Sequence, residues 1–412
     1  MPNRILLDVA PLRDSRDFRL LFVGQMVNMV GNQLAVVAIP FQVYELTRSS
    51  LQVGAVSLAQ VVPLVVGALV GGAARNAVAH RTLLIAMSLV FALTSGALAV
   101  NACLGHPSML LIYVAGALGA GAGGAYSTAC SSVTASLVTP AHLLAAFAAM
   151  QVVDQAGMVA GPAVSGLLLQ VVHLQWVFAL DAMSSIAVAV TAACMVVPHS
   201  APGGERRRHP PFREGVGAIR RDHVLLAAYL IDLNAMVFGA PSSLFPALDH
   251  SLFGGRPSTL GFLYAAPGAG ALLGALTTGW LDRIRRHGVA IMLAVCVWGA
   301  AIVAFGLLRA LWVALVVLAV AGWADVISAV LRTTLLQSHA GEALRSRIAS
   351  VQMATVEGGP RLGGFESGAL AAATTTEISV VAGGLAAIGG ALIIGAALPG
   401  FRRYRRPDTQ EN

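Results

Sequence analysis

The chain has 412 residues, of which 57% are hydrophobic and 11% are charged, and its net charge is +7. A soluble domain averages about 25% charged residues, so this composition excludes an ordinary soluble protein. All 26 basic side chains are arginines, and they are scattered over short segments rather than gathered on one domain, which excludes a nucleic-acid-binding protein.

Twelve apolar stretches are each long enough to cross a hydrocarbon core of about 30 Å. The sequence therefore predicts an all-α polytopic membrane protein with twelve transmembrane helices in two pseudo-symmetric six-helix bundles. In chain order, the predicted spans are residues 18–44, 50–74, 81–104, 108–137, 143–170, 175–197, 223–247, 258–281, 288–308, 310–337, 347–373 and 377–398.

A polar segment rich in Arg, Pro and Gly separates the sixth span from the seventh. The predicted organisation is an N-terminal bundle over 1–197, a cytoplasmic linker over 198–222, a C-terminal bundle over 223–398 and a cytoplasmic basic tail over 399–412. With both termini in the cytoplasm, 21 arginines lie in inside segments, and only Arg48, Arg256 and Arg309 lie in outside loops. This bias predicts that orientation in the cell inner membrane.

The two halves share features at a nearly constant spacing. Gly161-Pro162 in span 5 matches Gly359-Pro360 in span 11, and Asn76 after span 2 matches Asp282 after span 8. Two such pairs indicate an internal repeat of about 200 residues, which is typical of secondary transporters.

Span 1 carries Gln25, Asn28 and Asn32 at i, i+3 and i+7, which forms one polar stripe on an apolar helix. In the later spans, Tyr126 lies in span 4, and Asp232 and Asn234 precede the sequence GAPSSLFP, which predicts a break in span 7. Such side chains either contact a substrate or bond neighbouring helices together, and the residues leave both interpretations open.

Charged side chains at membrane depth are costly, so they are candidate functional residues. Asp154 precedes a glycine-rich segment in span 5. Asp325 and Arg332 lie two turns apart on one face of span 10, where they could exchange partners when a proton or an anionic substrate arrives.

Residues 356–368, VEGGPRLGGFESG, place two glutamates and an arginine in an apolar span. Glu357 and Arg361 have the i,i+4 spacing of an intrahelical pair, and Pro360 between them bends a helix. Glu366 faces away from Glu357. We interpret this segment as a flexible, charge-linked element that takes part in gating or coupling, with a static internal ion pair as the alternative. Asp181 and Glu45, near span ends, are expected to be solvated.

The chain resembles the major facilitator superfamily. The resemblance rests on the six-plus-six spans, the basic loops after spans 2 and 8, and the GxxxGPxxxG of span 5. Gly157, Gly161, Pro162 and Gly166 match that superfamily's antiporter motif. Four further segments are similar to the enterobactin-exporter-like branch, and this similarity extends over essentially the whole chain. They are RDFRLLFVGQ, LIDLNAMVFGAPSSLFPAL, GFLYAAPGAGALLGALTTGW and GGPRLGG.

The resemblance implies that spans 1, 4, 7 and 10 line a central cavity, which makes Gln25, Asn28, Asn32, Tyr126, Asp232 and Asn234 substrate-cavity candidates. It also implies that the loops after spans 2 and 8 hold the cytoplasmic gate, through Asn76, Arg81, Asp282, Arg283 and Arg286. The first loop departs from the family pattern GxLaDRxGRR, because Asn76 stands at the aspartate position. Gate control is therefore expected to depend on the second loop.

The residues and the resemblance together predict a secondary active transporter, not an enzyme. The expected function is proton-coupled export of a small secreted metabolite such as a siderophore, by alternating access. Two alternatives stay open: a multidrug efflux antiporter of lipophilic compounds, and a non-transporting membrane sensor or scaffold. No cofactor, metal or nucleic-acid partner is expected. The partners are a small-molecule substrate, protons and the lipid bilayer, and the protein is expected to act as a monomer.

Overall fold

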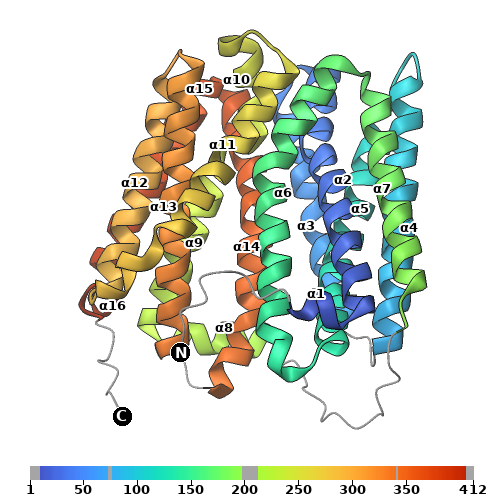
Figure 1. The fold of residues 1–412 in the computed structure, drawn as a ribbon. Coiled ribbons are helices and arrows are strands. Elements are labelled where there is room, and N and C mark those ends of the chain that lie inside the picture. Colours follow the sequence, from blue (N-terminus) through green and yellow to red (C-terminus); the bar gives the residue numbers. More distant parts are fainter. Residues whose placement is uncertain (1–9, 73–76, 197–211, 340–341, 405–412) are drawn as a thin grey trace. The chain divides into compact units, whose positions relative to one another are not determined.

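A computed structural model describes residues 10–72, 77–196, 212–339 and 342–404. In these residues the regular structure is helical throughout, which confirms the predicted all-α fold (Figure 1). The chain divides into two compact units. The first comprises Met1–Arg48, Ala59–Glu205 and Arg256–Ala265, and the second comprises Ser49–Leu58, Arg206–Gly255 and Ala266–Asn412.

The first half of the chain supplies seven α-helices in the described residues, together with the short 3-10 turn η1. Their bounds are α1 Ala10–Asp14, α2 Arg16–Thr47, α3 Ser50–Gly72, α4 Ala77–Cys103, α5 Met109–Leu137, η1 Pro140–His142, α6 Leu143–Val171 and α7 Leu174–Cys194.

The second half includes both long spans and short helical turns. Their bounds are α8 Phe212–Arg221, α9 His223–Phe238, η2 Pro241–Leu244, α10 Phe245–Leu248, η3 Asp249–Phe253, α11 Pro257–Leu276, η4 Thr278–Arg283, α12 His287–Leu307, α13 Leu311–His339, α14 Glu342–Ala373, α15 Thr376–Ala397 and α16 Pro399–Arg403.

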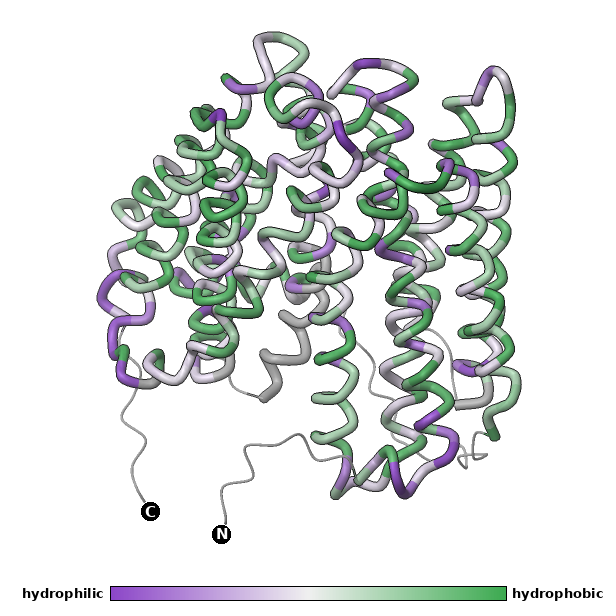
Figure 2. Tube along the Cα trace, turned by 45° about the horizontal axis from the view of Figure 1, so that its top comes forward, coloured by the Kyte–Doolittle hydropathy of each residue, from purple (hydrophilic) through white to green (hydrophobic). Residues whose placement is uncertain are grey.

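Eleven segments of the described chain are long and apolar enough to cross a membrane. The remaining long helix is α14, whose 32 residues also exceed the length of a span, although its apolar part carries Glu357, Arg361 and Glu366. Figure 2 shows hydrophobic residues along most of the length of the long helices and hydrophilic residues mainly towards their ends. The protein is therefore a multi-pass membrane protein.

Polar residues define where several spans begin and end. Ser15 Oγ accepts the Phe18 N–H at 3.1 Å at the start of α2, and Thr375 Oγ1 accepts the Ile378 N–H at 3.2 Å at the start of α15. Arg48 ends α2 in a left-handed conformation, with its N–H donating to Tyr44 O at 2.8 Å. These bonds satisfy backbone groups that a helix terminus leaves without intrahelical partners.

The start of α9 is capped by a carboxylate. Asp222 Oδ1 accepts the N–H groups of Val224 at 2.9 Å and Leu225 at 3.2 Å, and Asp222 Oδ2 lies 2.8 Å from His339 Nε2 at the end of α13. Burial tends to raise the pKa of Asp222, but the bonds from Leu225, His339 and Val224 together lower that pKa below its ordinary value. Asp222 therefore joins the ends of two spans.

Span 7 is broken where the sequence predicts a break. Helix α9 ends at Phe238, a 3-10 turn follows at Pro241–Leu244, and the chain continues through α10 into a π-helical turn at Asp249–Phe253. Pro241 begins the 3-10 turn and Pro246 lies at the start of α10, so both prolines occupy positions where their missing N–H costs little.

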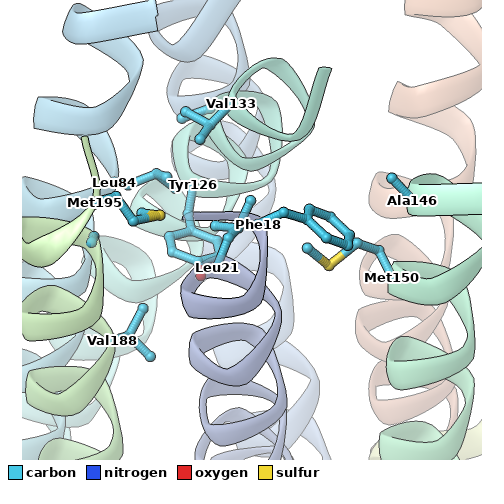
Figure 3. Packing of buried hydrophobic residues seen from close by; sticks show 11 residues of the cluster. Phe18, Leu21, Leu84, Tyr126, Val133, Ala146, Met150, Val188 and Met195 are labelled. Carbon is cyan, nitrogen blue, oxygen red and sulfur yellow. The ribbon is translucent and has the colours of Figure 1, made fainter. Parts of the chain in front are cut away.

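The first unit has a packed apolar core between α2, α4, α5, α6 and α7 (Figure 3). Phe18 and Leu84 are at most 1% exposed, and Tyr126 is 5% exposed in the same cluster. The Tyr126 ring also meets Phe91 edge to face, with centroids 6.1 Å apart. This packing fixes the ring, so the Tyr126 hydroxyl is held in one position.

Two of the predicted segments outside the spans contain helix. Residues 198–222 were expected to form a linker, and their second part forms α8; residues 399–412 were expected to form a tail, and their first part forms α16. In α8, apolar residues Phe212, Val216 and Ile219 recur at i, i+4 and i+7, a helical period that the linker prediction overlooked, whereas α16 has only five residues and is too short to show such a period.

Candidate functional site

In the first unit, Gln25 on α2 bonds to side chains on two other helices. The Gln25 amide donates from Nε2 to Asp154 Oδ1 on α6 at 3.1 Å, and Gln25 Oε1 accepts from the Tyr126 hydroxyl on α5 at 3.1 Å. Cys130 Sγ lies 3.9 Å from the same Oε1 atom. The glutamine thus uses both ends of its amide, and Asp154 is bound by a neutral donor rather than by a cation.

The other two residues of the polar stripe on α2, Asn28 and Asn32, differ in their exposure. Asn28 is half-buried and Asn32 is exposed, while the neighbouring Gln33 is 6% exposed. A Cβ added at Gly161 would lie 2.6 Å from Gln33 Cγ, so Gln33 packs directly against α6. Only Gln25 of the predicted stripe forms a bond to another helix that is visible in the described structure.

The second unit contains a buried ion pair between α9 and α13. Arg332 Nη1 contacts Asp232 Oδ1, and the two side chains are 6% and 3% exposed. The sequence placed Asp325 on the same helix face as Arg332, two turns away, and the structure shows that the ion pair of Arg332 is formed with Asp232. Helical spacing shows only which residues of one helix share a face, so it could not reveal this partner on α9.

Asp325 lies two turns before Arg332 on α13 and is half-buried. Between these two residues, Ser328 is 3% exposed and its hydroxyl has no hydrogen-bond partner in the described structure. The helix that carries Arg332 therefore also carries a second carboxylate and an unpaired hydroxyl. Polar groups of this kind are rare in a packed apolar interior.

Asn234 also lies on α9, and its side chain contacts a neighbouring span. Asn234 Nδ2 donates to Ala387 O on α15 at 2.9 Å, and a Cβ added at Gly390 would lie 2.7 Å from Asn234 Nδ2. This geometry is that of an interhelical hydrogen bond, which was one of the two interpretations left open by the sequence.

Helix α14 carries the charged segment continuously, with Pro360 inside the helix. The expected pair forms, because Arg361 Nη1 lies 3.4 Å from Glu357 Oε2. Glu357 is exposed and Arg361 is half-buried, so water screens this pair more than it screens the pair on α9 and α13. Glu366 Oε2 is buried without a hydrogen-bond partner in the described structure.

The glycine motif of α6 contacts α2 and the first part of α11, residues 257–265, which belong to the first unit. A Cβ at Gly157 would lie 2.8 Å from Met29 Cε on α2. On the other side, a Cβ at Gly166 would lie 2.6 Å from Gly261 Cα on α11, and a Cβ at Gly261 would lie 2.6 Å from Pro162 O. The backbones of α6 and α11 therefore approach at a distance that only glycine permits.

The second unit repeats this arrangement around α14. A Cβ at Gly359 would lie 2.8 Å from Met236 Cβ on α9, and a Cβ at Gly54 on α3 would lie 2.9 Å from Phe365 Cα. A Cβ at Gly364 would lie 3.4 Å from Ser57 Cβ on α3. The same pattern of glycine contacts in both units agrees with the internal repeat read from the sequence.

The predicted gate residues lie at helix ends. Arg81 Nε donates to Ala192 O at 3.0 Å, and the same guanidinium also donates to Ala193 O, so Arg81 satisfies carbonyl groups at the end of α7. Asn76 lies outside the described residues. Asp282 and Arg283 lie in η4, and Arg283 and Arg286 are exposed.

The sequence interpretation missed a buried carboxylate in the first unit. Asp181 on α7 was expected to be solvated, but it is 6% exposed and accepts a hydrogen bond from Ser95 Oγ on α4 at 2.6 Å. Its position close to the start of a span favoured the wrong prediction, because the sequence does not show that α4 packs over it. Glu45 is exposed, as expected, and pairs with Arg48 at 2.8 Å.

In the described residues, no three His, Cys, Asp or Glu side chains converge as metal ligands. The two networks described above instead combine carboxylates with an amide, a phenol and a guanidinium. Such groups can exchange protons and bind polar or anionic parts of a substrate, but they do not form a nucleophile with an adjacent base.

Comparison with known sequences gives a match along almost the whole chain. The family model described as Major Facilitator Superfamily matches residues 21–365. The chain is 30% identical to proteins named Enterobactin exporter EntS from Escherichia coli and Shigella boydii, over 98% of this chain and 97% of each relative. The protein of the same name from Escherichia fergusonii has the same identity and coverage.

Comparison with solved structures gives the same fold at low sequence identity. A mutant of the nucleoside transporter NupG matches with a TM-score of 0.74 at 14% identity, covering 94% of this chain and 100% of that chain. A D-xylose-proton symporter matches with a TM-score of 0.67 at 14% identity, covering 93% and 98%.

Proposed function

The chain belongs to the Major Facilitator Superfamily and is a membrane transport protein rather than an enzyme, and from this premise we propose that it is a proton-coupled exporter of an iron-chelating secreted metabolite. Transport proceeds by alternating access between two halves, residues 1–197 and 223–398. The protein acts as a monomer in the inner membrane, with both termini in the cytoplasm. The coupling ion is the proton, and no cofactor takes part.

The observation that carries this proposal is the end-to-end similarity to enterobactin exporters. The identity of 30% extends over 98% of this chain, so it includes both halves and all the helices that carry the polar networks. A similarity limited to one half would support the fold without supporting a shared type of cargo.

In the second unit, the ion pair provides a way to couple proton binding to substrate binding. Both side chains are almost fully buried, so each needs a compensating charge. Protonation of Asp232 would leave Arg332 without that charge, and an anionic group of the substrate would then stabilise Arg332. Asp325, on the same helix, is the second carboxylate that could take over this role.

In the first unit, Asp154 is the proposed proton carrier. Its Oδ1 atom accepts only from the neutral Gln25 amide, and no arginine pairs with Asp154 in the described structure. A carboxylate without a cation loses little when it is protonated. Gln25 also holds Tyr126, so a change at Asp154 is passed to α5 through one side chain.

Helix α14 provides the proposed gating element. Pro360 removes one backbone donor inside the helix, and the Glu357–Arg361 pair spans the same turn. Bending at this turn would change the partners of both charges, which links a conformational change to charge rearrangement.

Efflux of lipophilic drugs is the second candidate, and the close packing of the α6 glycine motif favours it. Gly157 and Gly166 contact α2 and α11 as described above, and the sequence motif that contains them is shared with drug antiporters. The substrate of this alternative would be apolar, so it would not require the Asp232–Arg332 pair.

The test is a comparison of metabolites in cells and medium. Wild-type and deletion strains are grown with and without iron, and both fractions are measured by untargeted mass spectrometry. The proposal predicts that a chelating metabolite accumulates inside the deletion strain only under iron limitation, and that a plasmid-borne copy restores its secretion. Equal metabolite distributions in the two strains would contradict it, and drug sensitivity of the deletion strain would support the alternative.

A further inference from the structure

A cavity of about 430 Å³ lies in the second unit, where α12 begins and α16 ends. It is lined by Arg286, Val289, Pro399, Arg402 and Arg403. The cavity is separate from the ion pair of α9 and α13, because none of those side chains lines it. Figure 2 shows hydrophilic residues in the last described part of the chain, before the C-terminus.

The lining is strongly basic. Three of its five residues are arginines, and none of the three forms an ion pair with an acidic side chain in the described structure. Arg286 is also the residue immediately before α12, so the first N–H groups of that helix add positive potential on the same side. The cavity is therefore suited to an anion that can accept several hydrogen bonds.

The arginines of α16 are attached to a well-anchored backbone. Phe401, between Gly400 and Arg402, is fully buried, and a Cβ added at Gly288 would lie 2.8 Å from Phe401 C. Immediately after α16, the Tyr404 hydroxyl lies 3.0 Å from Ser338 Oγ, and the Tyr404 ring meets the His339 ring at 5.3 Å. Anchoring on both sides reduces the entropy lost when Arg402 and Arg403 hold a ligand.

The composition of the cavity favours a phosphate attached to an apolar molecule. Guanidinium groups bind phosphate oxygens through paired, charge-assisted hydrogen bonds. Val289 and Pro399 add apolar surface to the same cavity, and α12, which contains Val289, is long enough to cross the membrane. A free phosphate ion would use the arginines but not this apolar surface.

We propose that this cavity binds the phosphate headgroup of an anionic phospholipid. The three arginines match a headgroup with two phosphates, such as that of cardiolipin, better than one with a single phosphate. The proposed orientation places this end of the helices at the cytoplasmic leaflet, where anionic lipids attract basic segments. The lipid would tie α16 to the start of α12 and would stabilise the second unit independently of the transported substrate.

The test uses purified full-length protein in detergent and native mass spectrometry. Cardiolipin, phosphatidylglycerol, phosphatidylethanolamine and inorganic phosphate are titrated separately. The double variant R402Q/R403Q removes two arginines of the cavity. The control R220Q/R221Q removes two adjacent exposed arginines from the last turn of α8, so it changes the net charge equally.

The proposal predicts that cardiolipin binds more tightly than phosphatidylethanolamine and that R402Q/R403Q weakens cardiolipin binding about thirtyfold. R220Q/R221Q should retain the wild-type affinity to within about threefold, which is below the effect of one arginine. Since Arg402 and Arg403 are exposed, both double variants are expected to fold. R286Q should also weaken cardiolipin binding without unfolding the protein.

Three outcomes would overturn the proposal. One is equal binding of cardiolipin and phosphatidylethanolamine by the wild type. Another is an equal loss of cardiolipin affinity in R402Q/R403Q and in R220Q/R221Q, which would indicate attraction to net charge alone. The third is displacement of cardiolipin by inorganic phosphate at equal concentration, which would identify a site for a soluble anion.

Discussion

Replacing Asp232 with asparagine should strongly destabilise the protein. The substitution keeps the size of the side chain but leaves the Arg332 guanidinium, which is 6% exposed, without its counter-charge. Removing one partner of a buried ion pair typically costs about 3–5 kcal/mol in the free energy of unfolding. We expect Asp232→Asn to fall in this range, because little water reaches either side chain.

The double variant D232N/R332Q should recover most of this loss. It removes both charges, so no uncompensated charge remains in the apolar interior. R332Q alone should be milder than D232N, because a buried carboxylate can take up a proton whereas a guanidinium stays charged. D232N/D325N should be less stable than D232N if Asp325 partly compensates Arg332.

The assay is reversible unfolding of the purified variants in mixed micelles, followed by circular dichroism, with a coupling free energy calculated from the four members of the cycle. The expected coupling between Asp232 and Arg332 exceeds about 2 kcal/mol. Strictly additive effects, or a D232N variant within about 0.5 kcal/mol of the wild type, would show that Arg332 does not depend on Asp232 for its counter-charge.

Three further predictions concern other contacts. Ser95→Ala should destabilise the first unit by about 1–3 kcal/mol, because Asp181 would lose its donor at 2.6 Å; thermal unfolding in detergent checks this, and an unchanged midpoint would contradict it. Gly54→Val should cost about 1–3 kcal/mol or more, since its Cβ would meet the backbone of Phe365; a stable variant would show that α3 and α14 can separate freely. The pKa of Asp222 is lowered because its hydrogen bonds outweigh its burial. Asp222 should therefore contribute stability above its unfolded pKa of about 3.9 and lose that contribution as the pH falls through its lower folded pKa. Asp222→Ala should make the unfolding midpoint less dependent on pH in this acid range, and an unchanged pH dependence would contradict the assignment.

The fold could be predicted from the sequence because each span carries its own signal. Hydropathy and length located the helices one by one, and the observed α2 and α15 begin within two residues of the predicted spans. The break in span 7 was also visible, since Pro241 and Pro246 lie within an apolar run. Helix α14 was predicted despite its charges, because the glycines and apolar residues around them maintain a span-length segment.

The associations between helices could not be predicted to the same extent. Arg332 pairs with Asp232 on another helix, whereas helical spacing could relate Arg332 only to Asp325 on its own helix. Gln25, Tyr126 and Asp154 were each selected as unusual residues in apolar spans, but only the structure shows that one glutamine joins the other two. Contacts between residues about 100 positions apart depend on packing, which a single sequence does not record.

The burial of Asp181 also could not be predicted from the sequence. A carboxylate near the start of a span is usually solvated, and no pattern in the chain placed Ser95 beside it. The close glycine contacts were likewise not specified by the sequence. The GxxxGPxxxG motif identified Gly166, but only the structure places Gly166 against Gly261 and, in the second unit, Gly54 against Phe365.

Accumulation in everted membrane vesicles tests proton-coupled export. Vesicles from a strain without its own siderophore exporters are prepared with the wild type, with D154N, or without the protein, and enterobactin serves as the probe. We expect wild-type vesicles to concentrate the probe only while a proton gradient is maintained. We also expect D154N, inserted at the same level, to lose the gradient-driven part. Accumulation that persists after the gradient is collapsed, or wild-type vesicles that accumulate no more than vesicles without the protein, would rule out proton-coupled export.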